Sequence, residues 1–250
     1  MNENKGFTLV ELSIVIVIIG LIVSGIVGAQ SLVRQAKVRS VITEYKTYKL
    51  AANAFKLEYD GLPGDFINAS AYGLGTSGDG SNLILGSSTE VYYAWQHLGN
   101  AELVQGQYSG ADAGSPNYQI GVNLPPSGFG PNVTAVFSSI DLASTNCIAT
   151  FSSPLYGLHS LINVIAVGSN DVDSSGCPRY GFLRVSEAHG IDAKIDDGLP
   201  DSGIMFSAND YNTNVNGDRC VDNNTEGTGG ANYDFDETGE SCRLIFRLGL

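Results

Sequence analysis

An apolar stretch near the N-terminus constrains this chain more than any other feature. From Phe7 to Ala29 the sequence runs for 23 residues with a single charged side chain, Glu11. A helix of that length crosses a hydrocarbon core of about 30 Å with some tilt. The stretch is longer than the apolar region of a secretory signal peptide, and no Ala-x-Ala-like cleavage site follows it. The sequence therefore predicts a membrane helix that the protein keeps.

The carboxylate of Glu11 needs a partner in that setting. An acidic side chain inside hydrocarbon is costly unless it pairs with a cation or faces protein. No Lys or Arg lies between Phe7 and Ser31. The partner would therefore come from a neighbouring chain, or from an α-amine that cleavage releases close by. The alternative is that Glu11 lies near enough to a membrane face to reach lipid headgroups.

The eight residues from Lys5 to Leu12, KGFTLVEL, resemble the prepilin processing motif shared by type IV pilins and the pseudopilins of type II secretion. This resemblance implies that a membrane prepilin peptidase cuts after Gly6 and N-methylates Phe7. It also implies that Glu11, fifth in the mature chain, pairs with the N-terminal amine of an adjacent subunit during filament assembly. The membrane half lacks the proline that many pilin helices carry. The specific motif is short, so it indicates the class of protein better than its individual role.

A periodic apolar pattern continues the predicted helix beyond the membrane. Arg34, Lys37 and Arg39 mark the aqueous boundary. Apolar residues then recur at helical spacing, namely Val38, Val41, Ile42, Tyr45, Tyr48, Ala52, Phe55 and Tyr59. A continuous helix over residues 7–58 would be ~78 Å long, and the Gly and Pro residues after Asp60 would end it. The alternative is a break between a membrane anchor and a separate amphipathic helix.

These patterns divide the chain into a leader (1–6), a membrane half (7–29) and an amphipathic half (30–58) of one helix, and a globular head (59–250). The head holds 6 Lys and Arg against 22 Asp and Glu, whereas residues 1–58 hold 7 against 4. Nucleic acid is bound through clustered Lys and Arg, so an acidic head disfavours that partner. A segment of this length can bury its own core.

Short strand-like runs between Gly- and Ser-rich turns predict an antiparallel sheet with long loops. We expect strands at 118–122, 133–137, 161–167, 181–185, 204–208 and 243–248, and helices at 89–101 and 188–195. With the long N-terminal helix packed against this sheet, the predicted fold class is α+β and pilin-like.

Four cysteines, all in the head, predict disulfides and an oxidising compartment. Of the three connectivities that four cysteines allow, we favour the sequential one, Cys147 with Cys177 and Cys220 with Cys242, because it closes the shortest loops. The other two connectivities stay open. The loop closed by Cys220 and Cys242 resembles the C-terminal disulfide-bounded region of many type IV pilins.

The segment between the last two cysteines is rich in oxygen ligands. The candidates for an irregular calcium site are Asp222, Asn224, Glu226, Asp234 and Asp236. Their spacing opens like an EF-hand loop, but Tyr233 stands where that loop requires a bidentate Glu. The resemblance adds weight, because major pseudopilins have a calcium site in their C-terminal loops. The simpler alternative is a solvated acidic loop, and no other cofactor is expected.

The sequence predicts no enzyme. The histidines His97, His159 and His189 are far apart, and no nucleophile, zinc-protease or nucleotide-binding pattern is present. Asp196 and Asp197 could act as acid and base, but the Asp-Gly step and nearby Pro predict a turn there.

We therefore expect a subunit of a type IV pilus or a pilus-like filament. It would be a single-pass protein of the bacterial inner membrane, with its head in the periplasm or at the cell surface. Its partners would be other pilin or pseudopilin subunits, the prepilin peptidase and an inner-membrane assembly platform. The alternatives are a type II secretion pseudopilin and, in a different class, a singly anchored extracytoplasmic binding protein.

Overall fold

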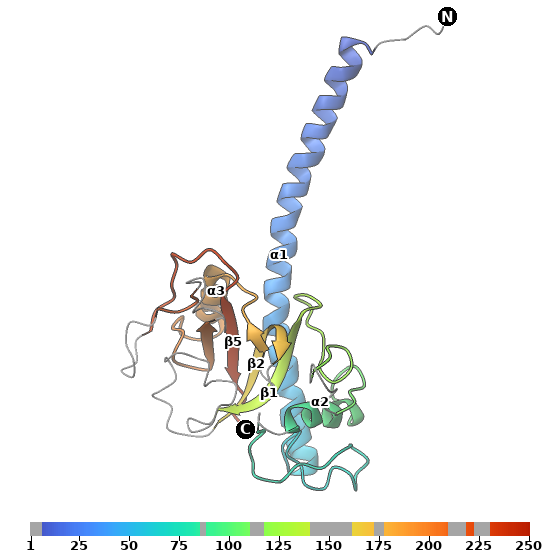
Figure 1. Ribbon diagram of the computed structural model, residues 1–250, viewed down its shortest axis with the longest axis vertical. Helices are drawn as coiled ribbons and strands as arrows, with labels where there is room; N and C mark the ends of the chain where they lie inside the picture. The colour runs from blue at the N-terminus through green and yellow to red at the C-terminus, as the bar shows by residue number, and fades with distance from the viewer. Residues whose placement is uncertain are drawn as a thin grey trace, which may run out of the picture.

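The chain forms one long helix that carries a head at the end away from the N-terminus (Figure 1). The computed structural model describes residues 7–85, 89–110, 118–140, 162–172, 178–209, 219–222 and 231–250. Its elements in chain order are α1 (Leu9–Tyr59), α2 (Glu90–Asn100), β1 (Val133–Ile140), β2 (Ile162–Val172), β3 (Pro178–Tyr180), α3 (Val185–Ile195), β4 (Met205–Asn209) and β5 (Cys242–Arg247). The architecture is α+β and pilin-like, as the sequence predicts.

The helix α1 runs without interruption, so the alternative of a break between anchor and amphipathic helix is wrong. At its start, the Thr8 hydroxyl oxygen accepts a hydrogen bond from the Glu11 N–H at 3.2 Å, and the Glu11 carboxylate accepts one from the Thr8 N–H at 2.8 Å. This reciprocal capping satisfies two free donors of the first turn. At its end, Asp60 adopts a left-handed conformation (φ 52°) and its N–H donates to the Lys56 carbonyl oxygen.

The head contains an antiparallel sheet in the order β1-β2-β5-β4, with β3 also paired to β2. Ala135 lies opposite Val167, Val167 opposite Leu244, and Leu244 opposite Ser207, so one register line crosses four strands. The strands expected at 133–137, 161–167, 204–208 and 243–248 are confirmed, with ends shifted by a few residues. The expected helices correspond to α2 and α3, and α3 starts three residues earlier than predicted.

Two strand predictions are wrong. Residues 118–122 form a turn, in which the Asn123 side chain accepts the Gln119 N–H at 2.7 Å and Gly121 has a φ of +87°. Residues 181–185 make only a short bridge to β5, because the Glu187 carboxylate accepts the Arg184 N–H and α3 begins. In both places a local side-chain hydrogen bond offers the backbone an alternative to the sheet. The short strand β3 was not predicted.

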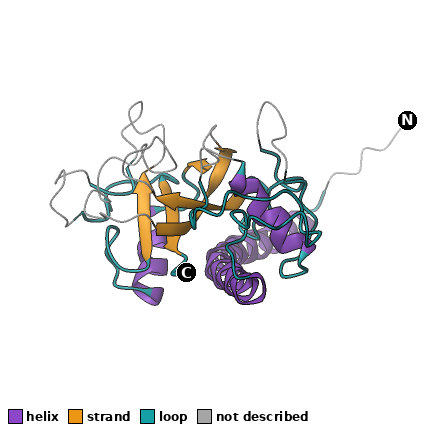
Figure 2. Cartoon of the chain, turned by 90° about the horizontal axis from the view of Figure 1, so that it is seen from below, coloured by secondary structure: helices purple, strands orange, loops and turns teal. Residues whose placement is uncertain are grey.

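The core lies where the distal half of α1 meets the sheet and α2. Figure 2 looks along α1 and shows the strands and α2 gathered around one side of it. Tyr45 of α1 stacks on Phe246 of β5 with ring centroids 4.2 Å apart, and Tyr48 meets Trp95 of α2 edge-on at 4.8 Å. Among the residues that the structure describes, the other half of α1 packs against nothing, and Phe7 is 92% exposed. Two halves of a single helix therefore have opposite environments.

Candidate assembly site

The first turn of α1 places the Glu11 carboxylate beside the predicted new N-terminus. One oxygen of that carboxylate accepts hydrogen bonds from both the N–H and the hydroxyl of Thr8, each at 2.8 Å. Thr8 follows Phe7 directly, so the carboxylate lies within about one residue of the amine that a cut after Gly6 would release. Gly6 itself lies outside the described residues. The helix N-terminus also favours a negative charge at this position.

Within the described chain, Glu11 forms no ion pair. The other polar side chains of the membrane half satisfy themselves locally. The hydroxyl of Ser13 donates to the Val10 carbonyl oxygen at 2.8 Å, and that of Ser24 donates to the Leu21 carbonyl oxygen at 2.9 Å. In residues 7–29, Glu11 is therefore the charged side chain that needs a cationic partner from outside the described chain.

The helix α1 is long and apolar enough to cross a membrane by its length and composition. Its membrane half presents aliphatic side chains around the whole circumference, with exposed fractions of about half or more. A helix that is apolar all round is covered by lipid or by other helices. A Cβ added at Gly20, Gly25 or Gly28 would meet nothing within 4 Å, so these glycines serve no contact with any described residue of the chain.

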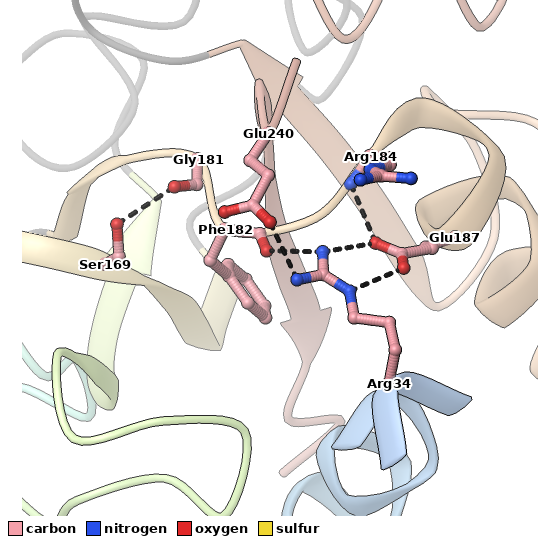
Figure 3. Close-up of polar contacts among 7 residues, drawn as sticks. All are labelled: Arg34, Ser169, Gly181, Phe182, Arg184, Glu187 and Glu240. Atoms are coloured by element: carbon pink, nitrogen blue, oxygen red, sulfur yellow. Dashed lines mark hydrogen bonds and ion pairs between the residues drawn. The ribbon is translucent and has the colours of Figure 1, made fainter. Parts of the chain in front are cut away.

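Arg34, one turn beyond the membrane half, joins α1 to the head (Figure 3). Its guanidinium donates to both carboxylate oxygens of Glu187 at 2.7 Å and to a carboxylate oxygen of Glu240 at 2.7 Å. The same group lies 4.8 Å from the centre of the Phe129 ring and donates to the Phe182 carbonyl oxygen at 3.4 Å. We call this set of contacts the Arg34 brace. It ties α1 to the first turn of α3 and to the loop before β5.

The electrostatics of the Arg34 brace favour the charged forms of its members. Burial of the Glu187 carboxyl acts to raise its pKa, but the hydrogen bonds from Arg34 and from the Arg184 N–H outweigh that effect and the pKa is lowered. Hydrogen bonding to Glu187 in turn raises the pKa of Arg34. A paired, bidentate contact of this kind is directional as well as attractive. The brace therefore orients the head relative to the membrane helix at neutral pH.

The structure contains one of the two expected cysteine pairs, a Cys220–Cys242 disulfide with an S–S distance of 2.05 Å. It links the start of β5 to the short segment around Cys220. Cys147 and Cys177 lie outside the described residues.

The proposed calcium ligands are only partly described, since Asn224 and Glu226 lie outside the described residues. The Asp222 carboxylate accepts the Asn232 N–H at 2.8 Å, and the Asp234 carboxylate accepts the Asp236 N–H at 3.3 Å. These two carboxylates therefore stabilise the backbone of the loop. Such hydrogen bonds are expected both in a solvated acidic loop and in a calcium-binding loop. The calcium site stays a prediction.

The structure brings acidic side chains together in two clusters that the sequence analysis did not predict. One contains Asp65, Asp79 and Glu90, and the other contains Asp192, Asp196 and Asp197. In the first, Asp65 accepts the N–H groups of Ser81 and Asn82, and burial raises its pKa to about 6. These bonds close the loop that follows α1. The three acidic residues of this first cluster are spread over 25 positions of the sequence, and no known spacing pattern predicts that they lie close together.

The residues considered for catalysis have structural roles. His97 is buried, accepts the Gly64 N–H at Nδ1 and contacts the Thr76 carbonyl oxygen at Nε2, and burial lowers its pKa. Asp196 accepts the Met205 N–H at 2.9 Å and Asp197 accepts the Leu199 N–H at 2.9 Å, which makes the predicted turn. His159 lies outside the described residues.

Comparison with known proteins locates a family signature at the N-terminus. Residues 1–27 match the family model described as the prokaryotic N-terminal methylation motif. No curated protein and no solved structure matches the chain. The matched segment contains Gly6, Phe7 and Glu11 and includes most of the exposed apolar half of α1. The chain thus carries the N-terminal signature of type IV pilins and pseudopilins on a pilin-like α+β fold.

Proposed function

We propose that this chain is a structural subunit of a type IV pilus or a pilus-like filament. The observation that carries the proposal is the exposed apolar half of α1, with Glu11 held at its first turn and without an ion pair to any described residue. Prepilin peptidase would cut after Gly6 and methylate Phe7. The subunit would then wait in the inner membrane as a single-pass protein, with its head in the periplasm or at the cell surface.

Assembly into a filament would cover the apolar half of α1 and give Glu11 a cationic partner. Side-by-side packing of several α1 helices covers the aliphatic side chains that no described part of this chain covers. The N-terminal amine of an adjacent subunit supplies the cation for Glu11, whose burial alone in hydrocarbon costs about 2.5–3.5 kcal/mol. Because the helix cap already holds the carboxylate toward the N-terminal end, little ordering is needed when the amine arrives.

The proposed role is structural and not enzymatic. The partners that follow from it are other pilin or pseudopilin subunits, the prepilin peptidase and an inner-membrane assembly platform. The Cys220–Cys242 disulfide supports a head outside the cytoplasm, where such bonds persist. It also favours a pilus subunit, through the resemblance of its loop to the C-terminal loop of type IV pilins.

Replacement of Glu11 tests the proposal. In the native host, Glu11→Ala should insert into the membrane as well as the wild type, because it removes a charge from hydrocarbon. It should lower the yield of sheared filaments by at least about tenfold, since each ~1.4 kcal/mol of lost subunit binding is tenfold. Ser24→Ala is the matched control, because that hydroxyl bonds only its own helix. Filaments at wild-type yield from Glu11→Ala would favour the anchored binding protein.

A type II secretion pseudopilin is the second candidate, because the methylation motif is shared by both classes. Deletion of the gene separates the two. Loss of surface pili with normal export of secreted enzymes supports the pilus subunit, and the opposite result supports the pseudopilin.

A further inference from the structure

The head carries an open groove between α1 and α3 that no described segment of the chain fills. Its volume is about 220 Å³. Its apolar lining comes from Val38, Ile42, Gly190 and Ile191, and its charged rim includes Arg39 and Lys194. A Cβ placed on Gly190 would meet nothing within 4 Å, which confirms that this wall is open. We call this feature the α1–α3 groove.

The rim of the α1–α3 groove carries uncompensated positive charge. Among the described residues, neither the Arg39 guanidinium nor the Lys194 ammonium forms an ion pair with a carboxylate. The Glu187 carboxylate also borders the groove, but Arg34 already holds both of its oxygens. The groove therefore combines an apolar floor with two free cations on a head whose net charge is strongly negative.

The same head exposes a segment of the opposite chemistry. Phe235 is 59% exposed and stands between Asp234 and Asp236 in the loop before β5. Its ring packs edge-on against the His189 ring of α3, with ring centroids 5.3 Å apart. The Asp236 side chain is exposed and has no partner among the described residues. An aromatic ring beside a free carboxylate is complementary to an apolar groove with free cations.

The groove and the Phe235 loop lie on opposite sides of α3. Successive helix residues are about 100° apart, so Ile191 lies roughly 200° round the helix from His189. Ile191 faces the groove, and His189 faces Phe235. A projection on one side and a complementary groove on the other allow head-to-tail contacts between copies of the chain. Contacts of this kind continue from copy to copy and build open helical filaments when they do not close into a ring.

We propose that Phe235 and Asp236 of one copy of this chain dock into the α1–α3 groove of the next copy. The Phe235 ring lies against Val38, Ile42 and Gly190, and the Asp236 carboxylate meets Lys194 and Arg39. The Arg34 brace holds Glu187, and with it α3, against α1 and so maintains the groove. This inference rests on the proposed assembly function and adds to it a contact between heads.

A cysteine pair tests the contact in assembled filaments. The double variant Gly190→Cys/Phe235→Cys, expressed as the full chain in its native host, should give a ladder of dimers, trimers and higher multimers on mild oxidation. A disulfide forms only where Cα atoms approach within about 7 Å. Each single variant should remain monomeric. The matched control Gly190→Cys/Leu199→Cys moves the second cysteine to another exposed apolar loop residue and should give no ladder.

The outcomes separate this contact from the proposed function. Filaments of the double variant without a ladder, or an equal ladder from the Leu199 control, would overturn the contact and leave the filament role intact. Wild-type chains that form no filament would overturn the filament role itself.

Charge reversal gives a second test that needs no cysteine. Lys194→Glu and Asp236→Lys should each lower filament yield by about threefold, the size expected for an accessible charge pair, and the double reversal should restore it. Neither side chain makes a described contact within its own head, so both variants should fold normally. Loss from Lys194→Glu alone would indicate an anionic lipid in the groove. That result, or a double variant without recovery, would contradict the proposal.

Discussion

Asp192 shows at the scale of one residue how burial acts on a charge. Its side chain is fully buried and accepts hydrogen bonds from the Tyr233 hydroxyl at 2.7 Å and the Gly198 N–H at 3.3 Å. Burial raises its pKa to about 6, with the nearby carboxylates of Asp197 and Asp196 adding to the effect. Because the folded pKa exceeds that of the unfolded chain, ionisation of this group opposes folding above about pH 6.

The variant Asp192→Asn should therefore stabilise the head at pH 8, by roughly 1–2 kcal/mol, because the amide carries no charge. Its oxygen accepts the Gly198 N–H, and its NH2 group donates to the Tyr233 hydroxyl oxygen, which in turn donates to Ser207. The gain should shrink as the pH falls through about 6 and vanish near pH 4. Thermal unfolding of the full chain in detergent between pH 4 and pH 8 measures it. Asp236→Asn, at an exposed position, is the control and should show no such trend. A gain of equal size at pH 4 would refute the electrostatic cause.

At the scale of the elements, long-range polar contacts join α1 to the head, and the Arg34 brace is one that spans 206 positions of the chain. It connects residue 34 to residues 187 and 240, and so links the membrane-proximal part of α1 to α3 and to the loop before β5. Figure 1 places α3 at the end of the head that faces the membrane half of α1. Apolar periodicity predicts which faces of α1 and α3 are buried, but it carries no information about which charged side chains meet. The brace was not foreseen for that reason.

Replacement of Arg34 by Met should destabilise the head by about 1–2 kcal/mol, because Glu187 and Glu240 lose their partner while remaining partly desolvated. Amide exchange should increase most in α3. Arg39→Met removes an equally long side chain five residues along the same helix and has no described ion pair to lose. Equal unfolding free energies for the two variants would show that the brace does not stabilise the head.

At the scale of the whole molecule, the two halves of α1 are energetically separate. The buried core takes its α1 residues from Val41 onward, and the membrane half contacts neither sheet nor α2. A chain that lacks residues 1–29 should therefore stay soluble without detergent. Its thermal midpoint should lie within about 2 °C of that of the full-length head, because little of the core is lost. A large fall in the midpoint would mean that the membrane half supports the head.

The amino-acid sequence by itself determined the long helix and where it ends, most of the sheet and the class of protein. These features depend on local patterns: an apolar run, a helical period, alternating strand residues and the eight-residue motif around Gly6 and Phe7. The predicted strands at 118–122 and 181–185 failed where short-range side-chain bonds competed with the sheet.

Only the tertiary structure decided how distant polar groups meet. The Arg34 brace, the acidic cluster of Asp65, Asp79 and Glu90, and the α1–α3 groove each join residues that are far apart in the sequence. Their positions follow from the packing of α1 against the sheet and α3, which brings side chains together irrespective of their spacing in the chain. A sequence pattern reports the period of one element. The contacts between elements depend on the packing geometry of all of them together.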